Sequence, residues 1–210
     1  MEIYSTEEQQ EEAIKGFLKE HGVSIFLGIA IGLGGLYGWK TYNQSQLESA
    51  EMASDAFNKV VQSTAEEGSD VLAQSEAFIS AHEDSSYAVL AAFVAAKEAV
   101  DNNQLDVAAQ KLQWAQENAA TAELKAIATT RLARVQLAQQ NFEAAMATLN
   151  AELPASYEAN VAELKGDIYL AQGDKDNART HYQNAADKGG LEGNPLLQVK
   201  LDDLAAPTQA

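Results

Sequence analysis

The sequence predicts an all-α protein with a single N-terminal transmembrane helix followed by a helical solenoid. Residues 23–39 are apolar and carry no charge. From residue 44 onward, apolar positions recur at three- and four-residue spacing, which is typical of amphipathic helices. The later part of the chain also resembles itself at a regular interval, as stacked helical hairpins do. Only 3 prolines interrupt the 210 residues, which further favours helices.

These patterns divide the chain into an acidic tail at residues 1–22, a transmembrane helix at residues 23–42 and a helical domain at residues 43–210. The seventeen uncharged residues at 23–39 span roughly 26 Å as a helix, close to the ~30 Å hydrocarbon core of a bilayer. Tyr37, Trp39 and Tyr42 gather at the end of this stretch, where aromatic rings favour the lipid–water interface. We therefore expect a membrane anchor.

Two other structures produce such stretches. A buried core helix is disfavoured because five glycines weaken a helix. A cleaved signal peptide is disfavoured because the preceding residues are acidic and bulky residues follow the stretch. Charge leaves the orientation open, since two lysines lie before the stretch and two after it: Lys15, Lys19, Lys40 and Lys59.

Glycines four residues apart occur twice in the anchor, at Gly28 and Gly32 and at Gly34 and Gly38. Gly28, Gly32 and Gly35 share one helix face, and small residues at this spacing let membrane helices approach closely. We expect this face to contact a partner helix. The alternative is that the glycines reflect only their general frequency in membrane helices.

Three segments of the helical domain share one pattern of small and large residues. The same offsets from three starting points give Ala96, Ala108 and Leu112; Ala133, Ala145 and Leu149; and Gly166, Ala178 and Tyr182. The third segment adds Tyr169 and a Gly173–Asp174 turn.

This pattern resembles the tetratricopeptide repeat. The resemblance implies pairs of antiparallel helices that pack closely at the small positions, with Leu112, Leu149 and Tyr182 filling the gaps between neighbouring repeats. The middle segment departs from it, with Gln136 where the third has Tyr169, and with Glu152 at a small position. We expect three repeats across residues 88–188, capped by residues 44–81 and 195–205.

The charge balance disfavours several classes of protein. With 31 acidic and 14 basic residues the net charge is -17, which argues against binding nucleic acid. The absence of cysteine excludes disulfides and thiolate metal sites. An acidic solenoid is expected to discourage anionic partners and to accept basic or neutral polypeptide segments.

No catalytic, metal-binding or cofactor-binding site is expected. His21, His82 and His181 are far apart and lack a metal-binding spacing. The acidic clusters, Glu66–Glu67 with Asp70 and Asp202–Asp203, lack a calcium-loop pattern. Trp114 is either a packing residue or a contact for a bound peptide. We therefore expect a protein-binding surface rather than an enzyme.

The chain as a whole resembles the bacterial YfgM family. The resemblance rests on the opening MEIYSTEEQQEEAIKGFLKEHG, the segment GLYGWKTYNQSQ at the end of the apolar stretch, and the Ala-rich degenerate repeats that follow. It implies an ancillary subunit of the SecYEG translocon in the inner membrane, with a cytoplasmic N-terminus and periplasmic repeats. It also implies association with the periplasmic chaperone PpiD, to which emerging chains are handed.

A competing hypothesis is a tetratricopeptide scaffold for a different envelope complex, such as one for cell division or outer-membrane assembly. A membrane-tethered hydrolase is a third class, and the lack of a catalytic pattern disfavours it.

Overall fold

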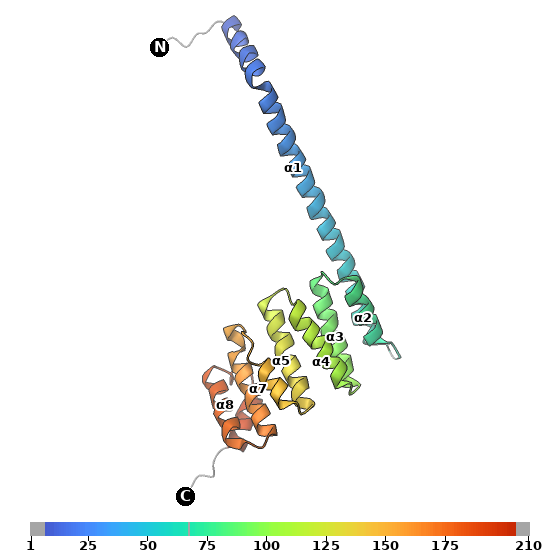
Figure 1. Cartoon of the computed structure of the whole chain (residues 1–210), viewed down its shortest axis with the longest axis vertical. Helices are drawn as coiled ribbons and strands as arrows, with labels where there is room; N and C mark the ends of the chain where they lie inside the picture. The colour runs from blue at the N-terminus through green and yellow to red at the C-terminus, as the bar shows by residue number, and fades with distance from the viewer. Residues whose placement is uncertain (1–6, 67, 205–210) are drawn as a thin grey trace. The chain divides into compact units, whose positions relative to one another are not determined.

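The computed structural model describes residues 7–66 and 68–204, and every regular element in these ranges is helical, which confirms the predicted fold class (Figure 1). Residues 1–6 of the acidic tail, Glu67 of the first acidic cluster and residues 205–210 lie outside the described residues. The elements are α1 (Glu7–Ser63), α2 (Val71–Ala81), α3 (Ser86–Asp101), α4 (Leu105–Asn118), α5 (Ala122–Ala138), α6 (Phe142–Thr148), the 3-10 turn η1 (Ala155–Tyr157), α7 (Glu158–Ala171), α8 (Lys175–Asp187) and α9 (Pro195–Asp203).

Helix α1 contains the apolar stretch. It is 57 residues long, or about 85 Å at 1.5 Å per residue, and it continues past residue 42 without a break. Of the helices in the described part of the chain, it is the one long and apolar enough to cross a membrane. Its apolar side chains are exposed, with Phe26 at 74% and Leu36 at 67%. Such exposure is typical of a surface that lipid covers.

The chain divides into two compact units, one ending at Met52 and the other beginning at Ala53. Among the described side chains, burial begins at Ala53, later than residue 43, where we expected the helical domain to begin. Ala53 and Val60 pack with Phe78 of α2 and Ala91 of α3. The last turns of α1 therefore form the first layer of the second unit.

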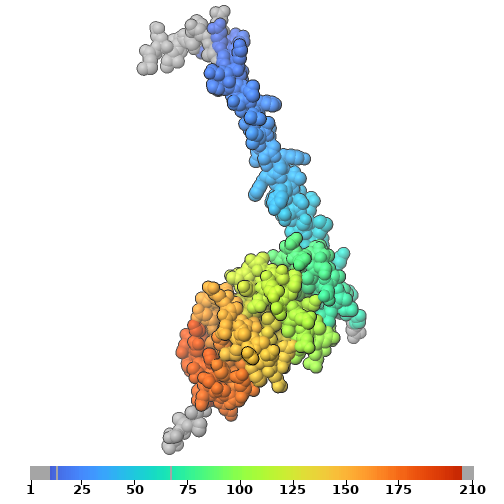
Figure 2. Space-filling view, viewed as in Figure 1, coloured from blue at the N-terminus to red at the C-terminus, as the bar shows by residue number. Residues whose placement is uncertain are grey.

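Three consecutive hairpins make up most of the second unit: α3 with α4, α5 with α6, and α7 with α8. The hairpins pack side by side in chain order, from green to red in Figure 2. Helix α4 also packs against α5, and α5 against α7. Each hairpin therefore covers the apolar side of the next, as in solenoids of stacked repeats.

The three turns inside these hairpins have the same backbone geometry. Asn103, Gln140 and Gly173 all adopt left-handed conformations, with φ of 58°, 60° and 83°. In each turn the next residue donates its backbone N–H to a carbonyl five residues earlier, in the pairs Gln104–Ala99, Asn141–Gln136 and Asp174–Tyr169, at 2.7, 2.9 and 2.9 Å. This hydrogen bond is that of a Schellman C-terminal cap. The sequence offsets therefore coincide with a structural repeat.

Helix α9 covers the last hairpin. Leu197 and Leu204 pack with Tyr182 of α8. Lys200 donates hydrogen bonds to Glu163 and Asp167 of α7, at 2.7 and 2.9 Å. The glycine-rich connection before α9 fits because Gly190 lies so close to the preceding helix that a Cβ there would approach a backbone oxygen within 2.6 Å.

Candidate functional site

No described side chain or neighbouring element packs against the glycine face of the anchor. A Cβ built on Gly28, Gly32 or Gly35 would meet nothing within 4 Å among the described residues. The three positions lie on one face of α1, since residues separated by three, four and seven positions share a face. The contact of this face with a partner helix stays a prediction.

The small and large positions of the repeat pattern lie inside the solenoid. The small residues Ala96, Ala108, Ala133, Ala145 and Ala178 are each at most 3% exposed, and Gly166 is buried. Leu112 lies in a cluster with residues of both α3 and α5, and Leu149 lies with residues of α5 and α7. Tyr182 packs with α7 and α9. These side chains join successive layers and are almost completely buried.

The middle repeat replaces an aromatic contact with a hydrogen bond. In the third repeat Tyr169 stacks on His181, with 5.1 Å between ring centroids. At the equivalent places of the middle repeat, Thr148 donates a hydrogen bond of 2.8 Å to Gln136. The departure from the repeat pattern at Gln136 therefore keeps the two helices of the hairpin in contact.

Each of the three histidines lies against a different aromatic ring. His21 lies against Phe17, His82 against Phe78 and His181 against Tyr169. Burial, together with the charge of Lys165, lowers the pKa of His181. Across the described ranges, no His, Asp and Glu side chains gather in a group able to hold a metal ion.

Trp114 is partly buried. It packs against the core cluster of the first repeat and also lines a pocket of about 410 Å³ between α2 and α4 with Glu76 and Lys111. A hydrogen bond of 2.9 Å joins Lys111 to Glu76 across this pocket. Trp114 therefore packs against the core and also reaches a surface pocket.

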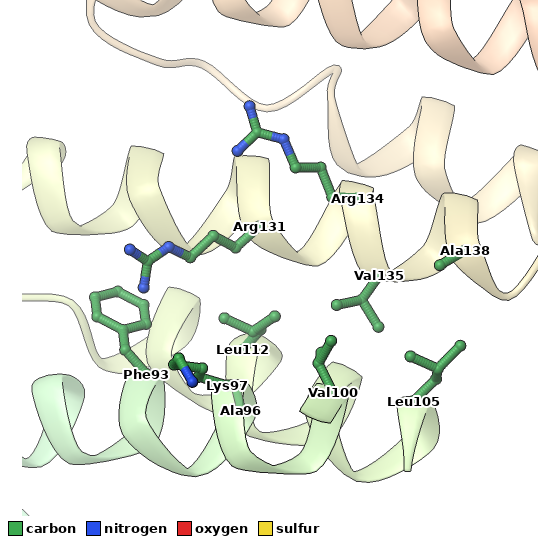
Figure 3. A pocket seen from close by; sticks show the side chains of 10 residues that line it. All are labelled: Phe93, Ala96, Lys97, Val100, Leu105, Leu112, Arg131, Arg134, Val135 and Ala138. Atoms are coloured by element: carbon green, nitrogen blue, oxygen red, sulfur yellow. The ribbon is translucent and has the colours of Figure 1, made fainter. Parts of the chain in front are cut away.

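An apolar groove opens between α3 and α5, with α4 behind it (Figure 3). Its volume is about 370 Å³, which lies within the range of small-ligand and peptide-anchor pockets. Apolar side chains make up most of its lining: Phe93, Ala96, Val100, Leu105, Leu112, Val135 and Ala138. Val100 is 42% exposed. The groove therefore offers accessible apolar surface between the first helices of two successive repeats.

Three cationic side chains border this groove: Lys97 from α3, and Arg131 and Arg134 from α5. Lys97 is paired with Asp101 at 2.5 Å, and this hydrogen bond raises the pKa of Lys97. The Arg131 guanidinium lies over the Phe93 ring, 4.8 Å from its centroid, a cation–π arrangement. In Figure 3 the Arg134 side chain points away from the groove floor.

Sequence reasoning did not identify Arg131 and Arg134 as site residues. The signal was present: they are two of the three arginines in an acidic chain, and they lie three residues apart on one helix. Net charge averaged over the whole chain concealed this local excess of positive charge.

The chain is similar to known proteins along nearly its whole length. Residues 15–206 match the family model described as a tetratricopeptide repeat-like domain. A protein of Escherichia coli strain K12 named "Ancillary SecYEG translocon subunit" is 34% identical over 206 residues, which cover 98% of this chain and 100% of the relative. Relatives with the same name occur in Haemophilus influenzae, at 31% identity over 96% of this chain and 99% of the relative, and in Neisseria gonorrhoeae, at 30% over 94% and 97%.

No solved structure matches the chain significantly. The resemblance drawn from the opening segment, the apolar stretch and the repeats is confirmed by these relatives. The chain belongs to the tetratricopeptide repeat-like family of ancillary SecYEG translocon subunits.

Proposed function

We propose that this protein is a non-enzymatic, membrane-anchored adaptor of the Sec translocon that links protein translocation to periplasmic chaperones. The observation that carries the proposal is the near full-length similarity to relatives named as ancillary SecYEG translocon subunits, which includes both the anchor and the repeats. The apolar helix α1 supplies attachment to the inner membrane. The stacked hairpins supply a surface for protein partners.

The proposed orientation has the N-terminus in the cytoplasm and the repeats in the periplasm. In this arrangement the repeats lie where a secreted chain leaves the translocon and meets chaperones such as PpiD. Alkaline phosphatase fused after the last residue tests it, because this enzyme becomes active only in the oxidising periplasm. We expect an active fusion, and an inactive fusion that is expressed at the same level contradicts the orientation.

Copurification from the native membrane tests the proposed assembly. The full-length protein, tagged and extracted in mild detergent, is expected to retain SecY, SecE, SecG and a PpiD-type chaperone. A variant in which residues 23–42 of α1 are replaced by an unrelated transmembrane sequence controls for simple membrane attachment. Recovery of a cell-division or outer-membrane assembly complex without SecY would support the alternative scaffold instead.

A further inference from the structure

Helix α5 reverses the charge of the chain around it. It carries one acidic residue, Glu123, and three basic ones, Lys125, Arg131 and Arg134, in a chain of net charge -17. Every other helix in the described part of the chain has at least as many acidic as basic residues. Arg131 and Arg134 are one helical turn apart, so their charges reinforce each other at the edge of the groove.

These two arginines have no carboxylate partner among the described residues. Some other cations are paired, as Lys97 is with Asp101, Lys111 with Glu76 and Lys200 with Glu163. Arg179, the third arginine, pairs with Asp176 and donates to the carbonyl of Leu204. Arg131 and Arg134 combine two properties: they lack a carboxylate partner in the described part of the chain, and they border the apolar groove. This edge is therefore a place where carboxylates from outside can bind.

The size and apolar lining of the groove indicate which other side chains the bound segment carries. The lining residues extend from Phe93 to Val100 on α3 and from Arg131 to Ala138 on α5, a length of roughly 10 Å along each helix. This length and the apolar floor fit one or two large apolar side chains of a polypeptide segment. The two guanidinium groups point in different directions (Figure 3), so a single terminal carboxylate reaches only one of them.

We propose that the groove between α3 and α5 binds a segment of a partner protein that brings a large apolar side chain onto the groove lining at Val100 and acidic side chains onto Arg131 and Arg134. Charge complementarity carries the choice of occupant, since guanidinium groups form bidentate hydrogen bonds with carboxylates. This deepens the proposed adaptor function and rests on it. It also departs locally from the expectation that the acidic solenoid discourages anionic partners.

A random twelve-residue peptide library displayed on phage tests the proposal. The bait is the full-length protein in lipid nanodiscs, after subtraction of binders to empty nanodiscs. We expect enriched peptides to combine Asp or Glu with large apolar residues. Synthetic versions of these peptides are expected to bind with micromolar dissociation constants. Their affinity is expected to fall as the salt concentration rises. Enrichment of basic or uncharged peptides, or no enrichment, overturns the proposal.

Matched charge reversals on α5 locate the binding surface. Arg134→Glu is expected to weaken binding of the selected acidic peptides by roughly tenfold or more. Lys125→Glu makes the same charge change on the same helix, at an exposed residue outside the groove, and is expected to weaken it much less. Equal losses in the two variants show an effect of net charge alone and overturn the site. Circular dichroism melting checks that both variants fold.

Two further readouts separate this proposal from its alternatives. A dimer of the purified protein that Arg134→Glu dissociates, measured by light scattering, identifies a second copy as the occupant and overturns the choice of another protein. The peptide assay uses purified protein, whereas the adaptor function is read from SecY recovery in membranes. Failure of the groove with SecY retained is therefore distinguishable from failure of the adaptor function itself.

Discussion

The ring of Tyr182 occupies the space that a side chain on residue 166 would need. A Cβ built on Gly166 would lie 2.4 Å from Cε1 of Tyr182, far inside van der Waals contact. The Tyr182 hydroxyl donates a hydrogen bond of 2.7 Å to Asp167, which fixes the ring against α7. The other two repeats have Ala96 with Leu112 and Ala133 with Leu149 at the equivalent positions, so the glycine and the tyrosine form a matched pair.

Gly166→Ala is therefore expected to destabilise the protein by about 2 kcal/mol, the usual cost of overpacking a buried contact. Thermal unfolding of the full-length protein, followed by circular dichroism, measures it. In a Tyr182→Leu background, which recreates the Ala–Leu pair of the other repeats, the same substitution is expected to cost much less. An equal loss in both backgrounds would show that the tyrosine is not the cause.

The network around Lys200 predicts a loss of stability at alkaline pH. Burial, the hydrogen bond to Asp167 and nearby carboxylates raise the pKa of Tyr182 above its ordinary 10.0. Burial opposes the charge of Lys200, but Asp167 and Glu163 outweigh it and raise its pKa above 10.5. Because both groups bind protons more tightly in the folded state, their contribution is complete below pH about 10 and is lost as the pH rises further.

The midpoint of thermal unfolding between pH 8 and about 11.5 tests this dependence. The wild-type midpoint is expected to fall more steeply above pH about 10 than that of a variant combining Tyr182→Phe with Lys200→Met. That variant is expected to be less stable at neutral pH, since it leaves Glu163 and Asp167 without their cation. Parallel alkaline slopes in the two proteins would rule out this network as the source.

The left-handed turn positions predict that glycine stabilises both turns, so that adding and removing glycine have opposite effects. Gln140 adopts φ of 60° and Gly173 adopts φ of 83° at equivalent points of their repeats, and a side chain in this conformation costs about 1 kcal/mol. Gln140→Gly is expected to raise the free energy of unfolding by a few tenths to about 1 kcal/mol, and Gly173→Gln to lower it by about 1 kcal/mol. Denaturant titration measures both variants. The same sign for both would contradict the shared geometry.

Substitutions on the glycine face of the anchor are expected to weaken binding of a membrane partner while the helical domain stays folded. Replacing Gly28, Gly32 and Gly35 with leucine is expected to reduce copurification of a membrane partner severalfold, because leucine keeps helices apart. Ala30→Leu places a leucine on the opposite face of α1 and serves as the control. Unchanged recovery of the partner, or an equal loss in the control, would remove the role of the glycine face.

Local patterns in the sequence predicted most of the fold. The three hairpin turns lie at the same offset from Gly166, Ala133 and Ala96. Such turns follow from local sequence because a Schellman cap depends on residues close together in the chain. The apolar stretch likewise marks α1 by composition alone. The clamp of Lys200 on Glu163 and Asp167 was not predictable, since it joins residues more than thirty positions apart across a glycine-rich connection of irregular length.

The groove escaped prediction for a different reason. Its floor consists of residues such as Leu112 and Val135 that also serve as core positions, and periodicity does not distinguish a fully covered core residue from one at the edge of an opening. The sequence shows that Arg131 and Arg134 are close together, but only the fold shows that they border a groove between α3 and α5. The net charge of the chain shows only the excess of acidic residues, whereas the structure shows where the basic residues lie.

The shared hairpin turn also bears on how the chain is made. Each turn is closed by a backbone hydrogen bond between residues of its own hairpin, and most helix contacts join neighbours in the chain. Assembly can therefore proceed from the first hairpin to the last while later residues are still being synthesised. Helix α9 follows the three hairpins in the chain and packs onto the last of them.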